Sequence, residues 1–178
     1  MDWRARASAE LFGPAATPGD HWRTLAAATL GATTAAALTY ATEPGIRPLS
    51  LIVVAVVAFD LFGGLWSNAI VAAWTGVRRS QLGRILFVAL HPHAFVLAWA
   101  VTGYDVLDAA AIWFWAAAGS AIVGALPSPR RPAAALWLCA LGIGVLTFLS
   151  GQTTTSWVAG AYLLKLLAAF AARPDPTT

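Results

Sequence analysis

The chain has 178 residues, of which 59% are hydrophobic and only 11% are charged, with a formal net charge of +3 at pH 7. A soluble domain carries about 25% charged residues, and the apolar residues here fall in long runs, so this composition argues against a soluble globular domain. A nucleic-acid partner is not indicated either, because most arginines lie in short loops beside apolar runs. We expect an all-α, polytopic transmembrane helix bundle whose partner is the lipid bilayer.

Six apolar segments make up the predicted transmembrane domain, residues 22–172. Each supplies most of the roughly 20 residues that cross about 30 Å of hydrocarbon. The predicted spans cover residues 22–42, 49–75, 82–101, 109–126, 133–150 and 157–172. Residues 1–21, which contain several glycine and proline breakers, are expected to form a cytoplasmic or interfacial segment, and residues 173–178 a C-terminal tail.

The first span is rich in alanine and threonine and contains Gly31, which predicts a closely packed helix. A cleaved signal peptide is the alternative, because residues 39–41 form a weak cleavage site. Asp2 and Glu10 ahead of the apolar run, and the length of the run, favour a retained helix.

The second span carries Asp60 within the stretch VAFDLFGGLWSNA. On a helix, Gly64 and Ser67 share the face of Asp60, with Gly63 beside them and Asn68 on the flank. This stripe of small residues lets another helix approach closely. Two interpretations stay open: a packing seam whose aspartate is neutral or paired with a lysine, and a proton or metal site that the glycines open.

The third span contains His91 and His93 on either side of Pro92. Histidines two residues apart point about 200° apart on a regular helix, so a straight helix would separate them. Pro92 removes a backbone donor and clashes with the carbonyl of Val88, which predicts a break here. The break can turn both rings toward one cavity. The alternative is a kinked helix in which each imidazole bonds to a neighbour.

The fourth and fifth spans hold few polar groups. Asp105 and Asp108, three residues apart, are expected to be solvated or to cap the start of the fourth span. Cys139 is the only cysteine and lies within the fifth span, so an intramolecular disulfide and a thiolate metal cluster are excluded. We expect a small buried side chain at this position.

The sixth span carries Lys165, the only lysine, with Tyr162 one turn earlier on the same face. About 12 Å of helix separates Lys165 from Arg173, which is too far for its ammonium to reach the membrane surface comfortably. Pairing with Asp60 is expected instead, in a structural or a functional role.

Four ionisable side chains therefore lie at similar depth in three different spans: Asp60, His91, His93 and Lys165. A charge at the centre of a bilayer costs at least about 2.5–3.5 kcal/mol, so such residues usually face the interior of a bundle and face one another. We expect one shared polar centre.

Arginine placement predicts the orientation of the spans. Only Arg47, in the loop after the first span, falls on one side of the membrane, whereas the loops after the second and fourth spans and both ends of the chain share the other arginines on the opposite side. The arginines expected on that side are Arg4, Arg6, Arg23, Arg78, Arg79, Arg84, Arg130, Arg131 and Arg173. Both termini are therefore predicted to be cytoplasmic. The chain has ten arginines, one lysine and abundant alanine, which suggests high-GC coding and hence a bacterial source. Together with the six apolar segments, this predicts a multi-pass protein of a bacterial plasma membrane.

Three functions remain open. A small proton-linked permease or channel is the first, because membrane-embedded Asp, His and Lys chains are typical of proton relays. An aqueous path through so small a bundle would favour a homo-oligomer. The second is an intramembrane enzyme acting on a lipid-soluble substrate, with Asp60, His91 and His93 as the two-histidine, one-carboxylate ligands of a possible divalent metal. The third is a structural or partner-binding subunit whose buried charges fix helix register.

Overall fold

The structure is a computed structural model that describes residues 3, 9, 12–70, 80–150 and 156–173. Within these ranges every regular element is helical, which confirms the all-α class. The helices are α2 (Pro18–Thr42), α3 (Pro48–Ala69), α4 (Gln81–Ala89), α5 (His93–Ala100), α6 (Val106–Ala125), the 3₁₀ turn η2 (Ser128–Arg130), α7 (Arg131–Ser150), α8 (Ser156–Leu163) and the π-helical η3 (Leu164–Ala171).

Four helical segments are long and apolar enough to cross a membrane: Pro48–Ala69, Gln81–Ala100, Val106–Ala125 and Ser128–Leu149. The first predicted span forms the 25-residue helix α2, but its alanine and threonine content leaves it outside this group. The sixth forms the shorter apolar helix Ser156–Ala171. The second was predicted to reach residue 75; its helix ends at Ala69, and residues 71–75 lie outside the described ranges.

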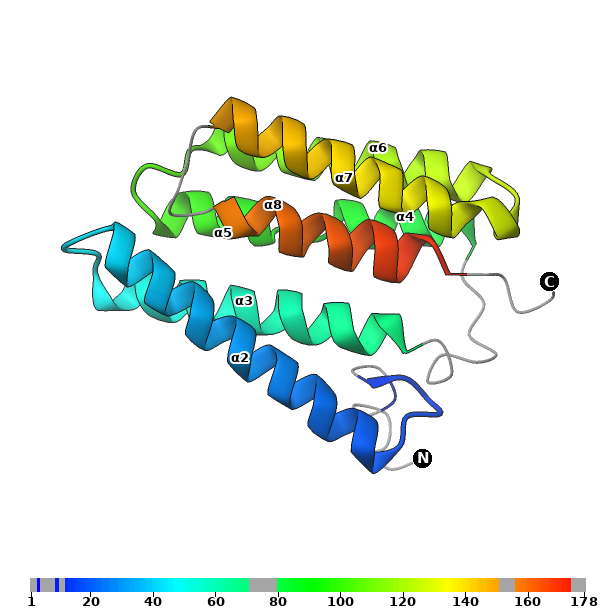
Figure 1. Cartoon of the computed structure of the whole chain (residues 1–178), viewed down its shortest axis with the longest axis horizontal. Coiled ribbons are helices and arrows are strands. Elements are labelled where there is room, and N and C mark those ends of the chain that lie inside the picture. Colours follow the sequence, from blue (N-terminus) through cyan, green and yellow to red (C-terminus); the bar gives the residue numbers. More distant parts are fainter. Residues whose placement is uncertain (1–2, 4–8, 10–11, 71–79, 151–155, 174–178) are drawn as a thin grey trace.

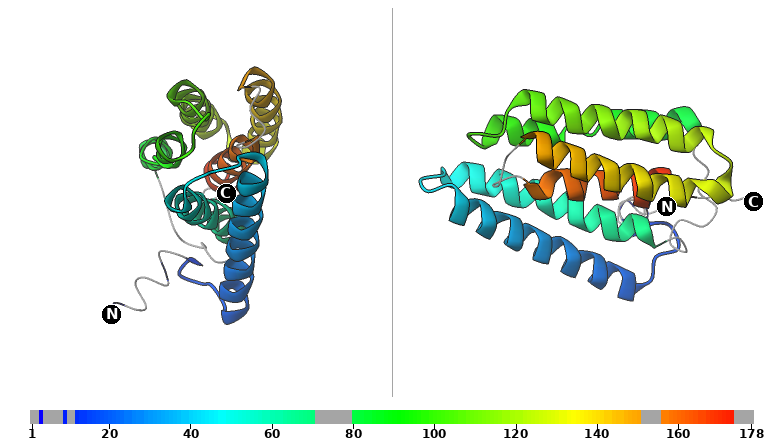
Figure 2. Two further views of the ribbon diagram at one scale, coloured as in Figure 1. Left: turned by 90° about the vertical axis from the view of Figure 1, so that its left-hand side faces the viewer. Right: turned by 45° about the horizontal axis from the view of Figure 1, so that its top comes forward.

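The helices run side by side along the longest axis of the molecule, and α2 crosses α3 at a tilt on the outside (Figure 1). The last helix, α8 continued by η3, lies near the centre of the bundle (Figure 2). Helices α3, α4, α6 and α7 all contact η3. Nearly every residue between Val158 and Ala172 is therefore buried or half-buried.

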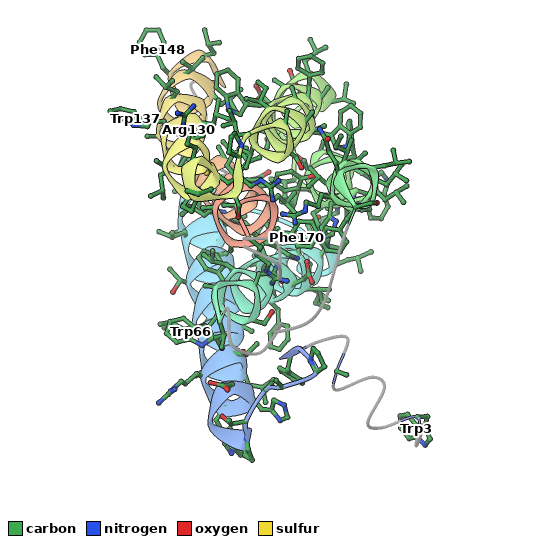
Figure 3. All side chains as sticks on the ribbon, turned by 90° about the vertical axis from the view of Figure 1, so that its right-hand side faces the viewer. Trp3, Trp66, Arg130, Trp137, Phe148 and Phe170 are labelled. Atoms are coloured by element: carbon green, nitrogen blue, oxygen red, sulfur yellow. The ribbon has the colours of Figure 1, made fainter. Side chains whose placement is uncertain are left out.

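The outer surface of the bundle is strongly apolar. Trp137 and Phe148 on α7 are 71% and 85% exposed, and both point away from the other helices (Figure 3). Leu136, Leu141 and Leu149 are exposed on the same helix. A continuous apolar surface of this kind is typical of a helix that contacts lipid.

Helix starts follow from local sequence. Thr17 and Asp20 form a reciprocal capping box at α2, with Pro18 in the first turn, where proline costs no hydrogen bond. Asp105 Oδ1 accepts hydrogen bonds of 2.8 Å from the backbone amides of Leu107 and Asp108, so the expected cap on the fourth span is present.

Cys139, the lone cysteine, is buried, as its apolar surroundings predicted. Its Sγ lies 3.3 Å from the carbonyl oxygen of Leu163 in the central helix. It therefore fills the contact between α7 and α8.

Three arginines bind carbonyl groups where helices end. Arg84 donates to the carbonyls of Ala171 and Arg173 at 3.1 and 2.8 Å. Arg173 donates to the carbonyl and side-chain oxygens of Asn68, just before α3 ends. Arg131 likewise donates to the carbonyl of Leu126 after α6.

Cations at helix C-termini complement the helix dipole and satisfy its last carbonyls. These arginines thus stabilise the end of the bundle at which α3, α6 and η3 end (Figure 1). Arg4, Arg6, Arg78 and Arg79, which entered the orientation argument, lie outside the described residues.

Replacing Arg84 with Gln should destabilise the bundle by about 1.5–3 kcal/mol, because a buried charged donor to two carbonyls is lost. Denaturation of the purified protein in detergent would measure this change. Arg23→Gln is the matched control. The side chain of Arg23 is 69% exposed, and its ion pair with Asp20, at 3.7 Å, lies on the surface, where such a pair contributes little to stability. Equal stability of the two variants would contradict the prediction.

Candidate functional site

Asp60, His91, His93 and Lys165 come together in one contact cluster, called the polar centre below. Asp60 lies near the middle of α3, and Lys165 lies at the start of η3 in the central helix. His93 begins α5, and His91 lies in the break between α4 and α5. Helix α3 contacts both α5 and η3.

The carboxylate of Asp60 links the other side chains of the polar centre. Its Oδ2 atom forms an ion pair with Lys165 Nζ and lies 3.1 Å from His93 Nε2. Lys165 Nζ also donates to the backbone carbonyl of Asp60 at 3.2 Å. The lysine side chain is only 4% exposed, so its ammonium does not reach toward the surface. It is neutralised by Asp60, the pairing that the sequence analysis favoured.

The two histidines lie beside one another, with ring centroids 5.3 Å apart. His91 Nδ1 is 2.7 Å from the carbonyl oxygen of Phe87. A carbonyl can only accept, so Nδ1 carries the proton, and in the neutral ring Nε2 is left as an acceptor. His93 Nδ1 is buried with no hydrogen-bond partner among the described residues. Both rings therefore keep one nitrogen available for chemistry.

The helix break that brings the histidines together is stabilised by two side chains from other helices. Leu90 to Pro92 interrupt the α-helix, as Pro92 predicted, and the amide of His91 bonds to Val88 in a tighter turn. The break frees carbonyls that the helix would otherwise use. Trp113 Nε1 donates to the carbonyl of Ala89 at 2.9 Å, and the Tyr162 hydroxyl donates to that of His91 at 2.6 Å.

Two adjacent glycines on α3 each leave space for a different neighbouring residue. A Cβ built on Gly63 would lie 2.9 Å from the Cβ of Ala28, so this glycine lets α2 pack closely. A Cβ on Gly64 would collide with Cε of Lys165 and lie 2.8 Å from its Nζ. Gly63 thus belongs to a packing seam, whereas Gly64 makes room for the buried ammonium.

The other predicted supporting residues have different positions. Ser67 lines a pocket next to Asp60, and its hydroxyl lies 3.3 Å from the carbonyl of Gly64. Asn68, which was expected on the flank of the stripe, accepts from Arg173 at the end of the bundle. Tyr162 lies on the helical segment that continues to Lys165, and its hydroxyl donates a hydrogen bond to the backbone carbonyl of His91.

The helix that carries Lys165 changes from α to π winding at Leu164. Single π turns occur inside α-helices, frequently at functional sites, because each one re-aims the side chains that follow. The change of winding falls one residue before the only lysine of the chain. Both helices that face Asp60 are therefore irregular at the polar centre.

A pocket of about 310 Å³ adjoins Asp60 between α2 and α3. Its walls are mainly apolar, and Asp60 is the only charged side chain among the described residues that line it. The side chain of Asp60 is 48% exposed, in contrast to the buried lysine behind it. The carboxylate therefore faces the pocket on one side and the polar centre on the other.

A metal ion is the second chemistry that the polar centre can accommodate. One ligand atom each from Asp60, His91 and His93 lies within 4.8 Å of the other two. Ligands of a tetrahedral zinc ion lie roughly 3.3 Å apart, given bonds of about 2.0–2.1 Å, so the side chains would have to converge further. The ammonium of Lys165 beside Asp60 would also repel a divalent ion.

No family model, curated protein or solved structure matches the chain. Its function is therefore argued from the site itself.

Sequence reasoning missed Trp113, Thr24 and the pocket. Trp113 was one of several tryptophans in apolar segments, and nothing in the local sequence marks it as the donor to Ala89. Thr24 lies one helix away from Asp60, and only the α2–α3 contact brings it to the same pocket.

Gly64→Ala should destabilise the protein by about 1–3 kcal/mol, because the new methyl group and the ammonium of Lys165 cannot occupy the same space. Gly144→Ala on α7 is the matched control, since a Cβ there meets nothing within 4 Å and alanine favours helix. Unfolding of both variants in detergent tests the difference. Two variants of equal stability would show that Lys165 has room to move.

Proposed function

We propose that the chain is a small proton-linked permease or channel of the bacterial plasma membrane, in which Asp60, Lys165, His93 and His91 handle the proton. In this proposal the six helical segments cross the bilayer with both termini in the cytoplasm. The chain assembles as a homo-oligomer if it forms an aqueous path, because so small a bundle encloses little space.

The topology is supported by the distribution of charge along the molecule. Arg84, Arg131 and Arg173 bind carbonyls at helix ends, whereas Arg47 lies in the connection between α2 and α3 at the opposite end of the bundle (Figure 1). An excess of arginine on one side of a helix bundle is typical of the cytoplasmic face.

One observation carries the proton-handling proposal: the carboxylate of Asp60 lies between a pocket and a buried ammonium. Within the described residues, its hydrogen bond and ion pairs all involve Oδ2. A proton that arrives through the pocket can neutralise the carboxylate and weaken its hold on Lys165. A buried charge without a partner is costly, so the two groups respond to each other.

The histidines extend the path beyond Asp60. His93 Nε2 is within hydrogen-bond distance of the carboxylate, and the ring of His91 is the next neighbour. An imidazole can accept a proton at one nitrogen and release one at the other near neutral pH, which makes it suitable for transfer. The proposed order of groups is therefore Asp60, His93 and His91, with Lys165 as the charge that balances Asp60.

In liposomes carrying a pH-sensitive dye, the native protein should dissipate a proton gradient, and Asp60→Asn should slow this at least tenfold. The single variant leaves Lys165 unpaired and can fail to fold. Asp60→Asn combined with Lys165→Met removes both charges at similar volume, so it should fold and still lack flux. Asp108→Asn, at the start of α6, is the control that keeps native flux.

This double variant also separates transport from the structural interpretation. A folded double variant with native flux would show that the ion pair only positions the helices. A folded double variant without flux, beside an active control, would support the relay.

A metal-dependent intramembrane enzyme is the second candidate, favoured by the approach of Asp60, His91 and His93. Two imidazoles and a carboxylate are ligands that zinc and iron accept, with open positions for water or a lipid-soluble substrate. The ion would then activate water or polarise a carbonyl. The adjacent ammonium is the reason for ranking this function second.

Elemental analysis of the purified protein distinguishes the two candidates. The proton-linked function predicts no stoichiometric metal. Near-stoichiometric metal that is lost in both His91→Ala and His93→Ala would favour the enzyme. His21→Ala changes the remaining histidine of the chain, outside the polar centre, and should leave any metal content unchanged.

A further inference from the structure

We propose that the pocket between α2 and α3 binds a small apolar amine, whose ammonium group pairs with Asp60. The inference rests on the proposed function, because it names the solute class that the same carboxylate would exchange against protons. It concerns the pocket side of Asp60, from which the proposed proton also reaches the carboxylate.

Charge gives the sign of the ligand. Among the residues that the structure describes, Asp60 is the only ionisable side chain that lines the pocket, and the ammonium of Lys165 lies behind it with its side chain only 4% exposed. A ligand in the pocket therefore meets the carboxylate before the lysine, and the single charge of an amine is repelled by Lys165 less than the double charge of a metal ion at the same distance. Within the described part of the chain, the hydrogen bond and ion pairs of this carboxylate all involve Oδ2, so its other oxygen, Oδ1, can accept a hydrogen bond from an ammonium.

A second polar group in the same pocket lacks a partner. Thr24 on α2 is 6% exposed and lines the pocket, and its Oγ1 has no hydrogen-bond partner in the described part of the chain. A buried hydroxyl without a partner costs free energy, so its presence needs an explanation. Because this Oγ1 atom is itself enclosed, a bound amine supplies one once the Thr24 side chain turns its hydroxyl toward the pocket.

The rest of the pocket suits an apolar body of limited size. Phe12 and Phe59 contribute aromatic rings, and Leu25 and Ala28 contribute aliphatic wall. Phe12 is held in place by a ring contact with His21, with centroids 4.3 Å apart. Pockets for small molecules begin at about 300 Å³, so a volume of about 310 Å³ fits a ligand with one ring and a short chain. Aromatic rings also attract an ammonium through their faces.

Isothermal titration calorimetry of the full chain in detergent, with 2-phenylethylamine and its neutral counterpart 2-phenylethanol as probes, tests the inference. The amine should bind at least tenfold more tightly than the alcohol, since only the amine can pair with Asp60. Thr24→Val keeps the shape of the side chain and should weaken amine binding at least threefold. Thr34→Val, on an exposed position of the same helix, should leave binding unchanged.

Equal binding of the two probes would overturn the proposal, because the pocket would then hold only an apolar molecule such as a lipid tail. Absence of amine binding, or equal affinities of the two threonine variants, would overturn it as well. The measurement needs no proton gradient, so it is independent of the liposome assay. Amine binding without proton flux would retain the ligand site and reject transport, and flux without amine binding would do the reverse.

Discussion

The ion pair between Asp60 and Lys165 is the constraint on which the interior of this protein depends. The ammonium lies in the central helix, where almost nothing is exposed, and a charge at such a place must be neutralised by a neighbour. Gly64 is small because Lys165 lies directly against it. Helix α3 is therefore held to the central helix at one register. His93 then meets the same carboxylate oxygen, which brings α5 into the cluster.

The broken helix is the second feature that makes the polar centre possible. A continuous helix would point His91 and His93 in different directions, and Pro92 prevents that continuity. The cost of the break is reduced by Trp113 and Tyr162, which donate to carbonyls that the break frees. Irregular backbone deep in a bundle is tolerated where protein groups satisfy it, and such places frequently serve transport. The π winding at Lys165 places a second irregular segment opposite the first.

The position of Asp60 relates the candidate functions to one another. The carboxylate contacts the buried ammonium, a histidine and the pocket at once, so the proposed protonation, metal binding and amine binding would all involve the same two oxygens. These events compete, because each adds positive charge at one carboxylate. A proton and an amine that compete for one carboxylate form the simplest basis for coupled exchange.

Composition and periodicity alone predicted the helical class, the approximate bounds of the apolar segments, the cap at Asp105 and the break at Pro92. Each of these follows from short-range rules: apolar runs, capping side chains and the missing amide of proline. The pairing of Lys165 with Asp60 was also accessible, since a lone buried cation needs an anion at the same depth. Tertiary structure decided the remainder: that Asn68 bonds to Arg173, that Tyr162 supports the backbone of His91, that Gly63 and Gly64 face different neighbours, and that Thr24 shares a pocket with Asp60. The reason is physical. The local sequence around a residue determines whether it is helical and how far along the helix it lies. Which side chain of another helix it contacts depends on how the separate helices rotate and tilt against one another.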